Sequence, residues 1–192
     1  MIRPGEGKRA ALSKPAEAAA PLRPMIYASL FAALTAAGAY LFIPIGPVPI
    51  VLQNMFVFLA GLLLGSRWGL ASVAVYLLAG ICGLPVFAGG TGGIGRIAGP
   101  TGGFLLGYLP AVFLVGWIAE RKPGRMFRDV AAMLLGGAVV YACGVPWLAM
   151  VTGLPLAKAF AVGMVPFLLG DGIKIAAAAF IAKSVRPAMR LT

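Results

Sequence analysis

Long apolar segments without charged side chains recur along this chain, and they constrain its fold more than any other feature. Residues 25–43 form the first of them. A helix needs roughly 20 apolar residues to cross a bilayer. Only 11% of the 192 residues are charged and 61% are hydrophobic, so a soluble globule of this size has too little interior to hide the apolar surface. The sequence therefore predicts a membrane protein.

The spacing of the apolar segments predicts an all-α fold with six transmembrane helices. We expect a flexible cytoplasmic tail over residues 1–24, a six-helix domain over 25–183 and a second tail over 184–192. Segment 84–103 holds eight glycines and is predicted to form an outer loop. The six predicted spans are residues 25–43, 51–65, 69–82, 104–119, 130–151 and 160–182.

The basic residues give an orientation. The formal net charge is +11, and with six spans and an inside N-terminus thirteen Lys and Arg residues fall on the inner side, against two on the outer side. Inner loops of membrane proteins are enriched in basic residues, which predicts that both termini are cytoplasmic. The basic residues are not interleaved with aromatic ones, so we expect no nucleic-acid partner.

Missing residue types exclude most catalytic chemistry. The chain has no histidine and two cysteines, which excludes a Ser-His-Asp triad and the common zinc sites. It also has no phosphate-loop motif for ATP hydrolysis. We therefore expect no enzymatic activity, no catalytic residue, no metal site and no cofactor.

Asp171 and Lys174 lie inside the sixth predicted span. A charge in the middle of a membrane costs about 2.5–3.5 kcal/mol on insertion scales, so such residues usually have a function. Their spacing of three puts both side chains on one helical face. Two interpretations stay open: an ion pair that holds the helices together, or a polar ligand site. Because buried ion pairs add little stability, we favour the ligand site.

The Gly-rich segment and the start of the second span offer further candidates. Arg96 is the one basic residue of segment 84–103 and is either a solvated charge or a carboxylate ligand. Gly89 and Gly90 would let the backbone approach a ligand closely. Gln53 and Asn54 either bond neighbouring helices or bind a polar ligand, and we expect only one of the two to face a given cavity.

Small residues repeat along the first predicted span. Ala28, Ala32 and Ala36 are spaced by four, with Ala33 and Ala37 beside them. This spacing allows another helix to pack closely. The helix on that face is either part of this chain or part of a partner subunit.

Several motifs resemble those of the biotin-transporter BioY family, in the same order along the chain. The resemblance covers roughly residues 25–183. The motifs are PIGPVP at 44–49 with Leu52 and Gln53 behind it, AGLLLG at 60–65, GLPVFAGG at 83–90, GPTGG at 99–103 and PFLLGDGIK at 166–174.

This resemblance implies a substrate-binding S component of an energy-coupling factor (ECF) transporter in a bacterial cytoplasmic membrane. Such a protein captures biotin and works with a transmembrane coupling subunit and two ATPases. The resemblance places Asp171, Lys174 and Arg96 in the biotin site and Ala28, Ala32 and Ala36 on the docking surface.

The chemistry of biotin suggests what each residue would do. Asp171 would accept the ureido N–H groups, and Lys174, Gln53 or Asn54 would donate to the ureido oxygen. Either Arg96 or Lys174 would bind the carboxylate, Phe87 and Tyr141 would form apolar walls, and segment 84–103 would close as a lid. The alternative function is a carrier that works alone on biotin or a similar small carboxylated vitamin.

Overall fold

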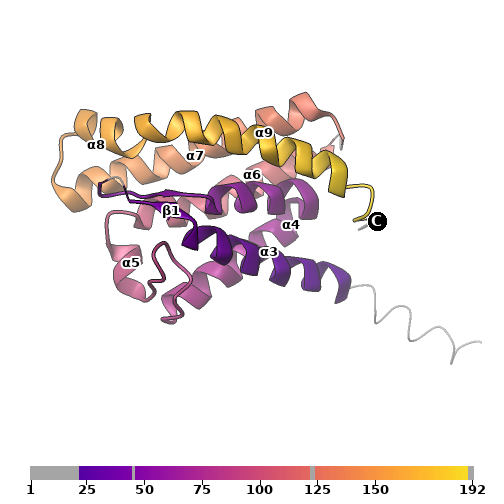
Figure 1. The fold of residues 1–192 in the computed structure, drawn as a ribbon, viewed down its shortest axis with the longest axis horizontal. Helices are drawn as coiled ribbons and strands as arrows, with labels where there is room; N and C mark the ends of the chain where they lie inside the picture. Colours follow the sequence, from indigo (N-terminus) through magenta and orange to yellow (C-terminus); the bar gives the residue numbers. More distant parts are fainter. Residues whose placement is uncertain (1–21, 45, 122–123, 190–192) are drawn as a thin grey trace, which may run out of the picture.

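The described chain is almost entirely helical, as its apolar segments predict (Figure 1). The computed structural model describes residues 22–44, 46–121 and 124–189. The elements are α3 (Leu22–Tyr40), β1 (Phe42–Ile43), β2 (Ile50–Val51), α4 (Gln53–Ile81), α5 (Ile94–Ala98), α6 (Gly102–Arg121), α7 (Met126–Thr152), α8 (Leu156–Gly163), the 3₁₀ turn η1 (Val165–Phe167) and α9 (Leu168–Val185).

Five helical stretches are long and apolar enough to cross a membrane: α3, α4, α6, α7 and the run Leu156–Val185. The longest of them, α4, is a hairpin of two arms. Gly65 has a non-helical backbone with φ of 79°, and a Cβ built on Gly69 would lie 3.1 Å from the Cα of Gly61. Residues eight apart in a straight helix are about 12 Å apart, so the chain reverses at Gly65. The two arms make α4 cross twice, which agrees with the prediction of six spans.

The turn of α4 is held by the last turns of α6. Gly116 packs directly on the backbone of Gly65 and Ser66, where a Cβ would have no room. The carboxylate of Glu120 accepts hydrogen bonds from the Ser66 N–H at 2.8 Å and from the Ser66 hydroxyl at 3.0 Å. A carboxylate at this position satisfies a free N–H at the start of the second arm.

Two predicted boundaries and one predicted continuous span need correction. The tail predicted over residues 1–24 ends earlier, because α3 begins at Leu22, while residues 1–21 lie outside the described part. The last helix reaches Val185, two residues into the tail predicted over 184–192. The sixth span is interrupted between α8 and α9, where Pro166 lies in a 3₁₀ turn and lacks the N–H that a continuous helix uses.

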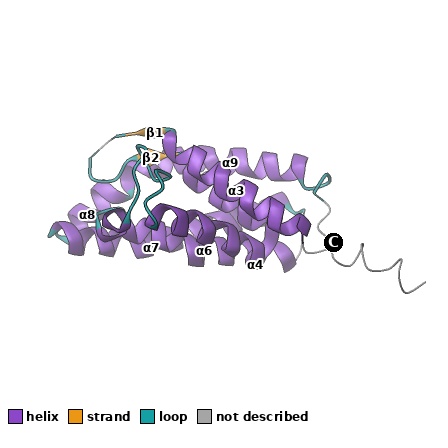
Figure 2. Ribbon diagram, turned by 90° about the horizontal axis from the view of Figure 1, so that it is seen from below, coloured by secondary structure: helices purple, strands orange, loops and turns teal. Residues whose placement is uncertain are grey.

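The two ends of the bundle differ in structure. The start of α3 and the segment after α9 lie at one end, called here the termini end. The opposite end, called the cavity end, carries β1, β2, α5 and α8 (Figures 1 and 2). At the termini end Arg186 pairs with Asp129 at 2.9 Å and donates to the Leu62 carbonyl at 3.2 Å, which joins α9 to α7 and α4. The side of the membrane on which the termini lie stays a prediction.

Candidate functional site

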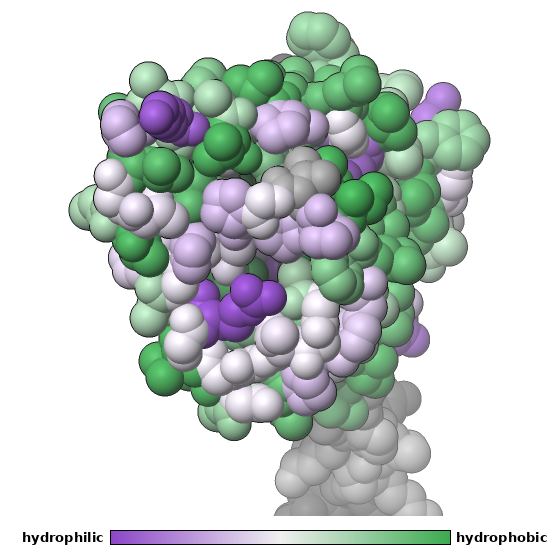
Figure 3. Space-filling view, turned by 60° about the vertical axis from the view of Figure 1, so that its left-hand side comes forward, coloured by the Kyte–Doolittle hydropathy of each residue, from purple (hydrophilic) through white to green (hydrophobic). Residues whose placement is uncertain are grey.

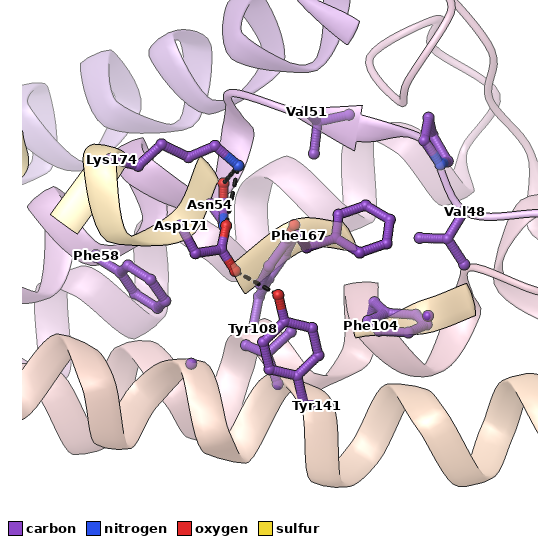
Figure 4. Close-up of a pocket in the computed structure, with 14 residues that line it drawn as sticks. Val48, Val51, Asn54, Phe58, Phe104, Tyr108, Tyr141, Phe167, Asp171 and Lys174 are labelled. Atoms are coloured by element: carbon purple, nitrogen blue, oxygen red, sulfur yellow. Dashed lines mark hydrogen bonds and ion pairs between the residues drawn. The ribbon is translucent and has the colours of Figure 1, made fainter. Parts of the chain in front are cut away.

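Four polar side chains from three helices meet at the cavity end (Figure 4). Asp171 lies in the first turn of α9, where the helix dipole favours a negative charge. Its Oδ1 accepts from Asn54 Nδ2 at 2.8 Å and from Lys174 Nζ at 3.0 Å, and its Oδ2 accepts from the Tyr141 hydroxyl. Lys174 Nζ also donates to Asn54 Oδ1 at 3.1 Å. The ion pair is therefore part of a larger polar cluster.

The polar cluster faces an otherwise apolar cavity. Asp171 and Lys174 keep 15% and 11% of their side-chain surface exposed, and both line the cavity together with Asn54 and Tyr141. The remaining wall is apolar or aromatic and includes Phe58, Phe104, Tyr108, Val140 and Phe167. A few convergent polar groups in an apolar cavity are typical of a small-molecule site.

A second cavity lies beside the first and is lined by Arg96, Gln53 and Phe87. Arg96 is fixed by two hydrogen bonds, from Nε to the Thr91 hydroxyl at 2.7 Å and from Nη2 to the Ala88 carbonyl at 2.9 Å. These bonds fix the guanidinium within the Gly-rich segment. The two cavities share part of their lining, namely Val48, Pro49, Val51, Phe104 and Tyr108.

Gln53 and Asn54 face different cavities, as we expect for neighbours in a helix. Asn54 lines the first cavity and Gln53 the second. The Gln53 side chain is buried, and its Nε2 has no hydrogen-bond partner among the described residues. The buried Tyr76 hydroxyl is a neighbour of this amide. Both alternatives drawn from the sequence for Gln53, a bond within the bundle and a bond to a ligand, therefore stay open.

Phe87 is almost completely buried beneath the second cavity and makes an edge-to-face contact with Tyr76, with ring centroids 5.6 Å apart. Gly89 and Gly90 line neither cavity. They have positive φ angles and lie against the rings of Phe42 and Tyr40. Their conformation serves the turn of the Gly-rich segment, and the ligand contact that we predicted for them stays a prediction.

The surface of the cavity end has a hydrophilic patch beside a hollow. In Figure 3, strongly hydrophilic residues gather beside a hollow near the middle of this end. Residues of intermediate hydropathy surround them, and hydrophobic residues lie mainly towards the edges of the view. Segment 84–103 is more ordered than the loop that the sequence predicts, because it contains α5 and a bridge between Phe87 and Thr91. Trp147 Nε1 donates to the Gly99 carbonyl at 2.9 Å and fixes the end of this segment to α7.

The alanine ladder of α3 points mostly into the bundle. Ala28 and Ala32 are buried and Ala36 is half-buried, so these alanines do not form an exposed docking surface. Of the two alternatives drawn from the sequence, their burial agrees with packing against a helix of this chain. The exposed small residues of α3 are Ser29, Ala33 and Ala37. The buried alanines and the exposed small residues are both spaced by four, so spacing alone does not tell which of the two sets faces outward.

Sequence reasoning missed most of the cavity wall. Tyr108, Phe104 and Phe167 lie in apolar runs, where an aromatic residue of the cavity cannot be told from one of the core. Val48 and Pro49, at the end of the Pro-rich motif, line both cavities, although the motif indicated only the family. The β1–β2 pairing of Phe42 with Val51 and of Ile43 with Ile50 fixes the position of this segment.

The fold and the candidate site together define a polytopic membrane protein with a polar cluster that faces an apolar cavity. A sequence model of the BioY family matches residues 10–191. "Biotin transporter BioY" of Thermotoga maritima is 43% identical over 161 residues, which cover 84% of this chain and 94% of that protein. "Biotin transporter BioY" of Rhizobium etli is 40% identical and covers 85% and 92% of the two chains.

A solved structure is also similar. The S-component for biotin from an ECF-type ABC transporter matches with a TM-score of 0.82 and 32% identity, covering 87% of this chain and 92% of that one. The chain belongs to the BioY family, which confirms the resemblance drawn from its motifs.

Proposed function

We propose that this protein is the biotin-binding S component of an ECF-type transporter and not an enzyme. The observation that carries the proposal is the cluster of Asp171, Lys174, Asn54 and Tyr141 in an apolar cavity. Support comes from the names of the relatives, which are transporters for biotin, and from the similar S component.

In this proposal the ureido ring of biotin lies in the first cavity. Asp171 accepts the ureido N–H groups, and Lys174 and Asn54 donate to the ureido oxygen. Lys174 and Asn54 already donate hydrogen bonds to Asp171. When biotin binds, its ureido group replaces some of these bonds with its own, so few polar groups are left without a partner. The rings and aliphatic chain pack on Phe104, Tyr108 and neighbouring apolar side chains.

The carboxylate of biotin then reaches the second cavity. Arg96 is favoured over Lys174 as its partner, because the charge of Lys174 is already paired with Asp171, whereas the two hydrogen bonds of Arg96 go to neutral oxygens and leave further N–H groups of the guanidinium for a carboxylate. The two cavities measure about 60 and 40 Å³. Ligand sites usually measure roughly 300 Å³ or more, so binding requires the shared wall at Val48, Pro49 and Val51 to move and join them.

Isothermal titration of the purified protein tests this assignment. We expect Asp171→Asn to weaken binding of both biotin and biotin amide about 100-fold, because charge-assisted hydrogen bonds contribute roughly 1.5–3 kcal/mol. We expect Arg96→Gln to weaken binding of biotin about tenfold and to change biotin amide little, since the amide lacks the carboxylate. Near wild-type biotin affinity in both Asp171→Asn and Lys174→Ala would contradict the proposal.

The coupling subunit and ATPases are proposed as partners, because the sequence has no phosphate-loop motif of its own. The exposed stripe Ser29, Ala33 and Ala37 of α3 is the surface best suited to a close helix contact. We expect Ala33→Trp to keep biotin binding and to prevent co-purification with the coupling subunit. Co-purification at the wild-type level would exclude this stripe as the contact.

A further inference from the structure

A long apolar groove runs along the outside of the bundle between α3 and α9, floored by the first arm of α4. It is lined by Tyr27, Phe31 and Leu34 of α3, by Phe56 and Leu59 of α4 and by Val185 of α9, among others. Every described side chain along it is apolar or aromatic. Within the described chain α3 packs mainly on α4 and barely touches α9, although Figure 2 shows the two helices along the same side of the bundle.

The groove adjoins a hollow at the termini end, and the lining of this hollow includes the basic side chain of Arg23. This hollow is lined by Arg23, Ile26 and Tyr27 of α3 and by Pro187 and Ala188 after α9, so Tyr27 belongs to both. Arg23 is exposed and lies one turn before Tyr27. The groove is therefore apolar along its length and positively charged at one end.

The length of the groove matches one leaflet of a bilayer. From Arg23 to Leu34 the helix rises by about 17 Å at 1.5 Å per residue. Half of a hydrocarbon core of roughly 30 Å is about 15 Å. Arg23 then lies at the level of the phospholipid headgroups, and the groove ends near the middle of the membrane.

We propose that this groove binds one anionic phospholipid of the leaflet at the termini end. One acyl chain lies between α3 and α9, where an empty groove would lose van der Waals contacts. The lipid phosphate pairs with Arg23, which has the charge and fork geometry to bind it. The site is distinct from the two cavities at the cavity end and does not depend on what those cavities bind.

Native mass spectrometry of the protein released from mixed phosphatidylglycerol and phosphatidylcholine vesicles tests this site. We expect one retained lipid, with phosphatidylglycerol preferred. Arg23→Gln should lower the preference about fivefold, the effect of one basic residue near a membrane surface. Arg67→Gln is the matched control, because Arg67 is an exposed arginine at the turn of α4 that lines neither the groove nor the hollow. Equal losses in both variants would overturn the role of Arg23.

The acyl-chain contact needs a second variant. Leu34→Trp should fill the groove and abolish the retained lipid, whereas Leu134→Trp, on an exposed part of α7, should keep it. Retention at the wild-type level in Leu34→Trp would overturn the proposal. A wild-type protein that retains no lipid would also overturn the proposal. If Leu34→Trp then prevents binding of the coupling subunit or of a second copy, the groove is a protein interface.

Discussion

Each end of the bundle holds an acidic side chain paired with a basic one, but the surroundings of the two pairs differ. At the cavity end, Asp171 bonds Lys174, Asn54 and Tyr141 and faces a cavity. At the termini end, the Asp129 side chain is 3% exposed and accepts hydrogen bonds from both terminal nitrogens of Arg186. Asp129 lines neither cavity. An ion pair in a membrane bundle is thus suited to bind a ligand only where it adjoins space that a ligand can enter.

The small residues divide in the same way. At the termini end, Gly116 and Gly65 bring two helices into backbone contact. At the cavity end, Gly89 and Gly90 shape a turn under Tyr40 and Phe42. The turn of α4 at the termini end therefore depends on close backbone packing, whereas Gly89 and Gly90 at the cavity end serve the conformation of a turn. The variants below test the contrast between the two ends, from the largest expected effect to the smallest.

Gly116→Leu should have the largest effect, because a side chain there would collide with the backbone at Gly65 and Ser66. We expect loss of the folded protein, or a destabilisation of about 3 kcal/mol or more where some protein folds. Fluorescence-detected size exclusion in detergent measures this. Gly137→Ala is the control, because a Cβ at Gly137 would meet one atom, Phe58 Cζ at 4.0 Å, which is ordinary van der Waals contact. A normal elution profile and melting temperature for Gly116→Leu would contradict the packing at the α4 turn.

Arg186→Ala should come next, since it leaves the buried Asp129 carboxylate without its partner. Removing one partner of a buried ion pair costs roughly 3–5 kcal/mol. We expect a lower melting temperature and an unchanged affinity for biotin in the protein that remains folded. Lys183→Ala, at an exposed position of α9, should change neither quantity. A loss of affinity in Arg186→Ala at a normal melting temperature would break the division between the two ends.

Tyr141→Phe should have a moderate effect confined to binding. The Tyr141 hydroxyl donates to Asp171, and a hydrogen bond to a charged group contributes about 1.5–3 kcal/mol. Asn54 and Lys174 remain as donors, so we expect affinity for biotin to fall about tenfold by calorimetry. The melting temperature without ligand should hardly change. An unchanged affinity would show that the hydroxyl does not help to position Asp171.

Glu120→Gln should have the smallest effect. The amide oxygen can still accept from Ser66, so only the charge that strengthens these bonds is lost. We expect a destabilisation of about 1 kcal/mol or less in thermal unfolding and no change in affinity. A destabilisation as large as that of Arg186→Ala would mean that the carboxylate charge itself holds the α4 turn.

The sequence predicted the parts of this molecule that depend on long patterns. Apolar runs indicated the membrane segments, and the charged pair at spacing three indicated Asp171 and Lys174. The reversal at Gly65 was predicted as a gap between spans, because Ser66, Arg67 and Trp68 interrupt the apolar run.

Features that depend on tertiary packing were harder to predict. The break before α9 needed the local geometry around Pro166. The inward orientation of Ala28 and Ala32 depends on how α3 rotates against α4, and equal spacing on both stripes hides that rotation. The Tyr141 hydroxyl was predicted only as part of an apolar wall, because its bond to Asp171 joins residues 30 positions apart.

The central claim is that Asp171 serves the ligand and Asp129 serves the fold, and one thermal-shift measurement with and without biotin tests both. The wild type at about 100 times its Kd should gain roughly 5 °C or more. Asp171→Asn, whose Kd we expect to be about 100-fold weaker, is only half saturated at that concentration and should gain about 1 °C. Asp129→Asn should melt lower without ligand and keep the full gain. A full gain in Asp171→Asn, or its loss in Asp129→Asn, would contradict the account.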